Sequence, residues 1–173
     1  NKYPLFNQAT MTKDGEGNLW LFWATGDKAD PTGNGPAQYV YGLKPLLCRD
    51  STGAPTPCSR NDLDNITSQQ QAYCGTSSQK VGWYINLAGQ NEQVLAEPVA
   101  FGNVLYFTSF VPASGSSSSC TKTGTSYLYA IEIGKTSSAC TIGTGAFSGG
   151  ERRMVIGVGI ASAPMISLKP GSA

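Results

Sequence analysis

Hydrophobic residues occur along this chain in short runs that are separated by turn-forming residues. Residues 19–24 (LWLFWA) form a six-residue apolar and aromatic run between the turn residues 14–18 and 25–27. A run of this length and composition with such boundaries predicts a buried strand. Similar patterns predict further strands at residues 38–43, 82–87, 93–101, 104–111, 126–133, 152–157 and 163–168.

The spacing of these runs favours an all-β fold. With 21 glycines and 10 prolines among 173 residues, the chain leaves little room for long helices. Residues 82–133 form a nearly uninterrupted series of strands and hairpins, including a two-residue turn at Gly102 and Asn103. Pro98 marks a break or an edge position. This order predicts antiparallel four-stranded meanders, as in a propeller blade or a sandwich.

Length limits how many such units the chain holds. A propeller blade takes about 40–50 residues. The chain therefore corresponds to three or four blades, and we expect a partial β-propeller: residues 1–173 as a single domain that belongs to a larger propeller.

Polar segments interrupt the strands. Residues 1–17 are a mixed lead-in, residues 30–36 form a loop with two prolines and two glycines, and residues 112–125 form a serine-rich loop. Residues 48–80 are polar and carry three cysteines, so we expect a long surface insertion stapled by a disulfide, with a helical turn near 61–71. A stretch of this length is unusual in a compact domain and indicates a functional insertion or an elaborated edge.

The five cysteines each lie in or beside polar stretches rich in serine, threonine and glycine; they are Cys48, Cys58, Cys74, Cys120 and Cys140. Disulfides staple such loops in oxidising compartments, whereas free thiols prefer apolar surroundings. Cys120 and Cys140 flank one predicted strand and are the preferred pair, while the pairing of the other three stays open. One cysteine is free or pairs outside the segment, because five is odd.

Composition excludes several classes. Charged residues make up 13% of the chain and the net charge is +1, so no basic surface for nucleic acid is indicated. No run approaches the roughly 18 apolar residues of a membrane span, and residues 1–4 show no signal-peptide pattern. The chain contains no histidine, which argues against a zinc site with Cys and His ligands and excludes a Ser-His-Asp triad.

Two acidic clusters are candidate calcium ligands. Asp14, Glu16 and Asn18 place oxygen side chains at alternating positions of a turn, as a calcium loop begins. Thr25 stands where such a loop needs its distal bidentate glutamate, so a plain hairpin turn is the simpler interpretation. Asp62 and Asp64 form the second cluster, for which a solvated turn is again simpler.

Catalysis has little support in the sequence. Four glutamates are available as a carboxylate pair for glycoside hydrolysis; they are Glu92, Glu97, Glu132 and Glu151. Nothing in the sequence fixes a separation between any two of them, and we expect Glu132 to face outward from its strand. We therefore expect no enzyme activity, no catalytic residues and no cofactor.

Aromatic residues are concentrated in the predicted strands; they are Trp20, Trp23, Trp83, Tyr39, Tyr41, Tyr84, Tyr106, Tyr127 and Tyr129. They allow two interpretations, a platform for carbohydrate or packing in the core and between blades. Core packing is the simpler one.

Four stretches, in order, resemble the C-terminal propeller of the PilY family (also called PilC), which comprises type IV pilus tip-associated assembly and adhesion proteins. They are residues 21–27 (LFWATGD) with 38–43 (QYVYGL), residues 82–87 (GWYINL) with 97–99 (EPV), residues 104–112 (VLYFTSFVP) with 126–130 (SYLYA), and residues 157–164 (GVGIASAP). The family's acidic calcium loop and its N-terminal adhesive domain have no counterpart here.

The resemblance implies a non-enzymatic module that supports pilus biogenesis, surface adhesion or motility through protein contacts. Its expected partners are minor pilins or other pilus components and the remainder of its own full-length chain. Its expected location is the cell surface at the pilus tip or the periplasm. The alternatives are a quinoprotein-like or glycan-processing propeller enzyme and a lectin-like binding module.

Overall fold

The protein is built from short strands and single 3₁₀ turns. The computed structural model describes residues 5–33, 35–68, 80–87, 91–113, 124–133 and 142–168, and no α-helix occurs in these ranges. The strands are β1 (Thr10–Lys13), β2 (Leu19–Ala24), β3 (Gln38–Leu43), β4 (Leu63–Asn65), β5 (Gly82–Leu87), β6 (Val99–Phe101), β7 (Val104–Pro112), β8 (Gly124–Glu132) and β9 (Arg153–Val158). The 3₁₀ turns are η1 (Pro45–Leu47), η2 (Arg60–Asp62) and η3 (Ser148–Gly150). None of the helical turns in these ranges could cross a membrane.

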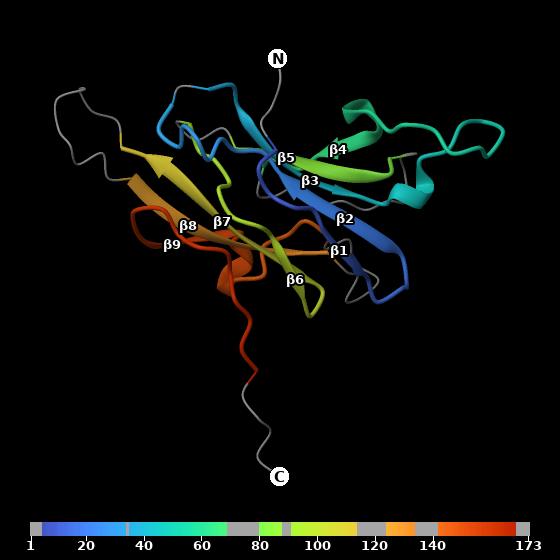
Figure 1. Ribbon diagram of the computed structural model, residues 1–173. Coiled ribbons are helices and arrows are strands. Elements are labelled where there is room, and N and C mark those ends of the chain that lie inside the picture. The colour runs from blue at the N-terminus through green and yellow to red at the C-terminus, as the bar shows by residue number, and fades with distance from the viewer. Residues whose placement is uncertain are drawn as a thin grey trace, which may run out of the picture.

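The first sheet has five strands in the order β1-β2-β3-β5-β4 (Figure 1). Neighbours are antiparallel except β4, which runs parallel to β5 at one edge. In β2 the residues alternate between half-buried and buried, so Trp20, Phe22 and Ala24 point to one face and Trp23 to the other. Both faces of this sheet therefore carry apolar side chains.

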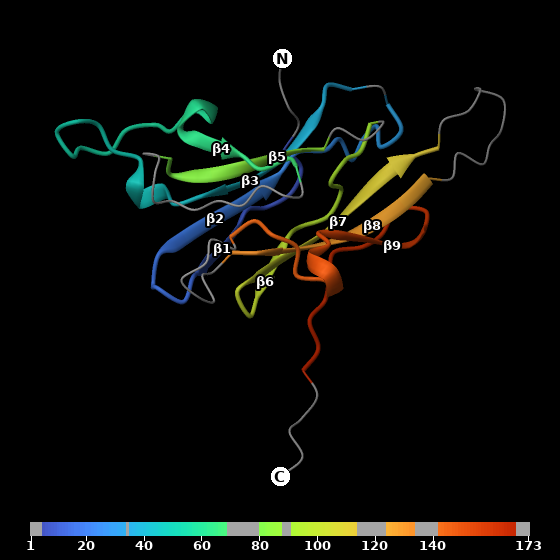
Figure 2. The same cartoon turned by 180° about the vertical axis from the view of Figure 1, so that it is seen from behind.

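The second sheet is a four-stranded antiparallel meander, with β6, β7, β8 and β9 in sequential order (Figure 2). Phe101 pairs with Val104, and the two-residue turn between them has positive φ at both Gly102 (58°) and Asn103 (62°). These angles match the right-handed twist of the strands and confirm the predicted hairpin. The predicted all-β fold with antiparallel sheets is thus confirmed. The predicted four-stranded meander is present in the second sheet, whereas the first sheet has five strands and a parallel edge pair. In the described ranges the two sheets form no closed ring, so the number of blades stays a prediction.

The inner faces of the two sheets share one hydrophobic core. The first sheet contributes Trp20, Phe22 and Trp83, and the second contributes Leu105 and Phe107, all with an exposed fraction of 0%. Buried Arg152 adds a polar link, because its Nη1 donates to the carbonyl of Ile66. Burial lowers the pKa of Arg152, and the negative end of the carbonyl dipole partly offsets the cost of burying the charge.

Gly42 lets two large rings meet in this core. A Cβ atom at this position would lie 2.6 Å from Cε2 of Trp83 and 2.8 Å from Cε1 of Phe22. The rings of Phe22 and Trp83 pack with centroids 5.9 Å apart across β3. The absence of a side chain at Gly42 is therefore a packing requirement.

The structure corrects several predicted elements. Residues 163–168 form no strand, and Pro164 could not donate to a ladder there. The predicted strand 93–101 shrinks to β6, preceded by a single bridge from Gln93 to Phe110. The lead-in contains β1, and the predicted helical turn at 61–71 is η2 followed by β4, with residues 69–71 outside the described ranges.

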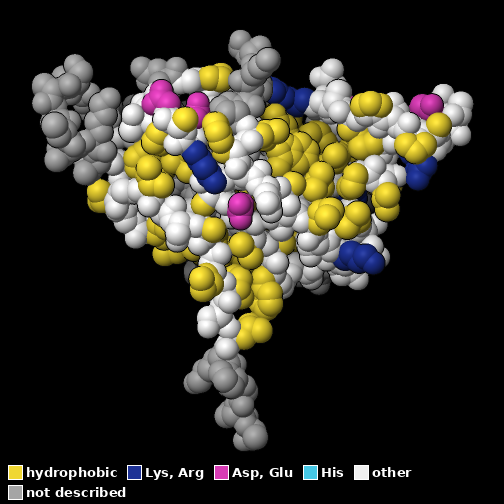
Figure 3. Space-filling model, viewed as in Figure 1, with side chains coloured by type: hydrophobic (Ala, Val, Ile, Leu, Met, Phe, Trp, Pro, Cys, Tyr) yellow, Lys and Arg dark blue, Asp and Glu magenta, His cyan; other side chains and the backbone are white. Residues whose placement is uncertain are grey.

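β9 is an exposed apolar edge. All six of its residues are exposed, among them Met154 (48%), Val155 (59%) and Val158 (76%). The chain after β9 crosses the outer face of the second sheet, where Thr108 Oγ1 donates to the Ser162 carbonyl at 3.0 Å. Hydrophobic side chains gather at the base of the molecule, where this stretch leaves the sheets (Figure 3).

Candidate functional site

A row of aromatic side chains crosses the outer face of the first sheet. Trp23 of β2 pairs in register with Tyr41 of β3, and Tyr41 pairs with Tyr84 of β5. The rings of Trp23 and Tyr41 stack with centroids 4.9 Å apart, and those of Tyr41 and Tyr84 lie 6.3 Å apart. Cross-strand aromatic pairs of this kind stabilise a sheet.

Packing covers much of this row. Tyr39 and Tyr41 each expose only 9% of their surface. The guanidinium carbon of Arg60 lies 4.3 Å from the ring centroid of Tyr39 and 5.8 Å from that of Tyr84, both within the range of cation–π attraction. These contacts favour the packing interpretation of the aromatic residues over a carbohydrate platform.

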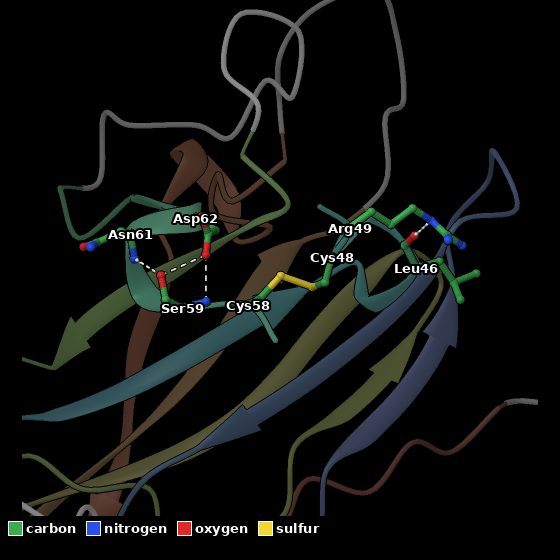
Figure 4. The surroundings of a disulfide bond; sticks show 7 residues. All are labelled: Leu46, Cys48, Arg49, Cys58, Ser59, Asn61 and Asp62. Atoms are coloured by element: carbon green, nitrogen blue, oxygen red, sulfur yellow. Dashed lines mark hydrogen bonds between the residues drawn. A yellow bond between two sulfur atoms is a disulfide. The ribbon is translucent and has the colours of Figure 1, made fainter. Parts of the chain in front are cut away.

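A disulfide joins Cys48 to Cys58 (Figure 4). Their Cα atoms are 5.5 Å apart, and ten positions separate them in sequence. Both cysteines are half-buried and pack against a cluster formed by Tyr39, Tyr41, Leu63 and Val81. The disulfide-closed segment, residues 48–58, is therefore anchored to the sheet by its sulfur atoms. The other three cysteines, and with them the predicted Cys120–Cys140 pair, lie outside the described residues.

Within the disulfide-closed segment, side chains hold the backbone. The carboxylate of Asp50 accepts hydrogen bonds from the Thr52 hydroxyl (2.6 Å), the Thr52 amide and the Ala54 amide. These bonds, that of the Thr52 hydroxyl first, lower the pKa of Asp50. Arg49 donates to the carbonyls of Leu46 (3.0 Å, drawn in Figure 4) and Gly53 (2.8 Å), so its guanidinium is held in place.

A capping box fixes the chain just after the disulfide. Ser59 accepts from the amide of Asn61, and Oδ2 of Asp62 accepts from the Ser59 amide (2.7 Å) and hydroxyl (2.8 Å) (Figure 4). These bonds, chiefly that of the Ser59 amide, lower the pKa of Asp62. The pattern Ser59-x-x-Asp62 is a capping signature that the sequence displays. Asp62 therefore caps the backbone of η2, in agreement with the interpretation of this acidic cluster as a turn.

The disulfide-closed segment borders a surface concavity of about 570 Å³. Its lining combines apolar groups with hydroxyl, guanidinium and carboxylate groups; they belong to Leu47, Cys48, Arg49, Asp50, Ser51, Thr56, Pro57, Cys58, Asp62 and Val81. This volume lies in the range of ligand-binding pockets. Mixed polarity on a rigid support suits recognition of a protein side chain or peptide.

The first calcium candidate forms a structural turn. The Asp14 carboxylate, buried at 8% exposure, accepts from the Trp20 indole at 2.9 Å and from the Asn18 amide at 2.9 Å. Burial raises the pKa of Asp14, but the hydrogen bonds from Asn18, Trp20 and Glu16 outweigh it and lower the pKa overall. Nζ of Lys44 lies 4.0 Å from Oδ2 of Asp14, so the charge of Asp14 has a cationic neighbour.

The other predicted site residues are not brought into one cluster. Asp64 lies in β4, and no group of three or more Asp, Glu, Cys or His suited to a metal occurs in the described ranges. Glu97 and Glu151 are exposed, and Glu132 is half-buried on the face opposite buried Ile131 and Ile133. The alternation places Glu132 on the outer face of β8, as predicted, but its Oε2 is buried there without a hydrogen-bond partner among the described residues.

Glu92 is the centre of a buried polar network that the sequence did not reveal. It is 2% exposed, and its Oε1 accepts from Ser109 (2.6 Å) and Tyr129 (2.8 Å). Its Oε2 lies 3.3 Å from Nη1 of Arg153, whose guanidinium stands 4.6 Å from the ring centroid of Tyr127. These hydroxyl and guanidinium partners occupy the carboxylate, which suits a structural role.

Comparison with known proteins adds no relative: no family model matches the chain, and searches of curated proteins and of solved structures give no significant match.

Proposed function

We propose that this chain is a non-enzymatic interaction module, and that it binds a protein partner through the concavity beside the disulfide-closed segment. The observation that carries this proposal is the anchoring of residues 48–58. The disulfide packs on the aromatic cluster, and Arg49 and Asp50 are held by hydrogen bonds at the rim. A preorganised loop loses little entropy when a partner binds.

The resemblance to the PilY family supports a more specific proposal. The partner is a minor pilin or another pilus component, and the module supports pilus biogenesis, adhesion or motility at the cell surface or in the periplasm. The Cys48–Cys58 disulfide agrees with export to an oxidising compartment. We further propose that the two sheets are propeller blades and that other parts of the full-length chain supply the remaining blades.

The test measures binding of this chain to the soluble domains of minor pilins by calorimetry. Removing most of the insertion, residues 50–78, would not test the contact surface alone. Leu63 and Ile66 within this range are buried, so the deletion would also disturb the packing of the fold. A point change is better: Thr56 is exposed and lines the concavity. Thr56→Lys should weaken binding at least about tenfold, or about 1.4 kcal/mol, without lowering the melting temperature.

Ser167→Lys serves as the matched control, because Ser167 is exposed on the stretch after β9. Equal affinity of the two variants would contradict the assignment of the concavity as the contact surface. Failure of every minor pilin to bind at about 100 µM, well above the roughly 1 µM Kd of a modest complex, would contradict the pilus assignment.

A further inference from the structure

Strand β4 runs into a three-residue pattern at its carboxyl end. Asn65, Ile66 and Thr67 follow the order Asn-x-Thr with a residue other than proline in the middle, and no other asparagine of the chain has a serine or threonine two positions later. This order is the acceptor pattern of N-linked glycosylation, which occurs on the surface of exported proteins. The surroundings of Asn65 decide whether its side chain can serve as an acceptor.

Asn65 lies at the surface, on the edge strand of the first sheet (Figure 1). It is exposed, whereas Ile66 is 1% exposed and packs in the core between the sheets. The motif is therefore anchored by its middle residue while the acceptor side chain faces solvent. In the part of the chain that the structure describes, Nδ2 of Asn65 takes part in no hydrogen bond, so the nitrogen that would carry a sugar is available.

Thr67 fixes the orientation of the Asn65 amide. Its hydroxyl donates to Oδ1 of Asn65 at 2.6 Å, and its backbone amide donates to the same oxygen at 3.0 Å. The Thr67 hydroxyl also accepts from the backbone amide of Asn86 in β5 at 2.9 Å, so the donor is itself held in place. When Nδ2 loses a proton to form a new bond, negative charge develops on the amide oxygen, where these two donors stand.

The fold leaves room for a saccharide at this position. Leu63, two positions earlier on β4, packs in the aromatic cluster of the outer face, and alternate residues of a strand share a face. Asn65 pairs in register with Tyr84 of β5 on that face. A saccharide on Asn65 would extend over the outer edge of the first sheet and would shield the free edge of β4 from pairing with other chains.

We propose that Asn65 is an acceptor site for an N-linked saccharide. The donor is a sugar whose anomeric carbon carries a diphosphate leaving group, either a nucleoside diphosphate sugar or a lipid-linked saccharide diphosphate. Nδ2 of Asn65 forms a bond to the anomeric carbon, the bond from that carbon to the diphosphate oxygen breaks, and Nδ2 gives up one proton. The Cys48–Cys58 disulfide agrees with an exported protein, and the inference does not depend on the proposed pilin contact.

The test measures the intact mass of the full-length protein isolated from the cells that export it, and then locates the modification by mass spectrometry of peptides. The wild type should carry at least one hexose or N-acetylhexosamine on Asn65, and Asn65→Gln should remove it. A short hexose adduct would indicate the nucleotide-linked donor, and a preassembled oligosaccharide would indicate the lipid-linked donor. Asn61→Gln is the matched control, because Asn61 is exposed on η2 and Leu63 stands where the pattern needs a hydroxyl.

Position 67 tests the pattern without touching the acceptor. Thr67→Ser keeps the hydroxyl and should keep the saccharide, whereas Thr67→Val removes the hydroxyl and should lose it. Thermal unfolding checks that Thr67→Val stays folded, because the Asn86 amide loses its acceptor in this variant. If it does not fold, Thr67→Ser and Asn65→Gln decide. The proposal is overturned if the wild type has the mass of the unmodified chain, or if the saccharide persists in Asn65→Gln.

Discussion

The hydroxyl of Tyr129 donates a 2.8 Å hydrogen bond to Oε1 of Glu92 across 37 positions of sequence. The bond joins β8 to the segment between β5 and β6, and Ser109 of β7 donates to the same oxygen. Burial, followed by the negative charge of Glu92, raises the pKa of Tyr129 far above its usual range. The raised pKa keeps the phenol protonated at neutral pH, so Tyr129 remains a hydrogen-bond donor to Glu92 there.

Replacing Tyr129 by Phe should lower the free energy of unfolding by about 1–3 kcal/mol, because the buried carboxylate loses one of its donors. Urea denaturation at pH 7 measures the loss. Tyr106→Phe is the control, since no hydrogen bond of the Tyr106 hydroxyl occurs among the described contacts and the change should stay within about 0.5 kcal/mol. Equal losses in the two variants would contradict the role of the network.

Asp14 predicts a pH dependence of stability. Its pKa is lowered in the folded state, so its charge stabilises the fold above the unfolded-state pKa of 3.8, and this contribution is lost as pH falls through the folded-state pKa. Asp14→Asn should cost about 1–3 kcal/mol at pH 7. The difference from the wild type should shrink when unfolding is measured near pH 3, about one unit below the ordinary aspartate pKa. A difference that does not change with pH would contradict this account.

Removal of the disulfide should destabilise the fold by a defined amount. Closing a loop of ten positions between Cys48 and Cys58 contributes about 2–3 kcal/mol through the unfolded chain. The double variant Cys48→Ser and Cys58→Ser should lose this amount in denaturant unfolding. It should also weaken partner binding, because residues 48–58 lose their anchor. Unchanged stability of the double variant would contradict this account, because it would mean that the disulfide does not restrict the unfolded chain.

The exposed edge of β9 predicts self-association. Val155 is 59% exposed, and edge strands with apolar side chains pair with other chains. Val155→Lys should shift the sedimentation profile toward monomer at protein concentrations where the wild type associates. Leu46→Lys is the control, since Leu46 is 62% exposed but lies on η1 and not on a strand. A monomeric wild type at about 1 mM, where even weak association with a free energy near −4 kcal/mol is visible, would contradict the prediction.

The strands predicted from the sequence are those in which apolar side chains concentrate. Residues 19–24, 38–43, 82–87 and 104–111 carry aromatic and β-branched residues between turn signals, and each is a strand in the structure. β1 escaped prediction because Thr10–Lys13 is polar apart from exposed Met11. The strand predicted at residues 163–168 was wrong. Met165 and Leu168 are apolar, as in a buried strand, but in the structure they are 92% and 70% exposed.

The sites were harder to predict than the strands. The role of Gln93 depends on contacts with residues more than 60 positions away, such as its bond to Asp30 (63 positions). A single sequence carries no signal for such pairs. The capping role of Asp62 could be predicted, because a capping box is a local pattern of four residues. The disulfide between Cys48 and Cys58 was among the open alternatives, because spacing alone does not select a partner.

The glycine between the rings of Phe22 and Trp83 has a consequence for ancestry. Since any Cβ at position 42 would collide with both rings, a homologue that keeps a tryptophan at the position of Trp83 and a phenylalanine at that of Phe22 must also keep this glycine. The three positions come from β2, β3 and β5, so they form a signature that is scattered in sequence and joined in space. A search for distant relatives can use this triplet as a filter where overall identity has decayed.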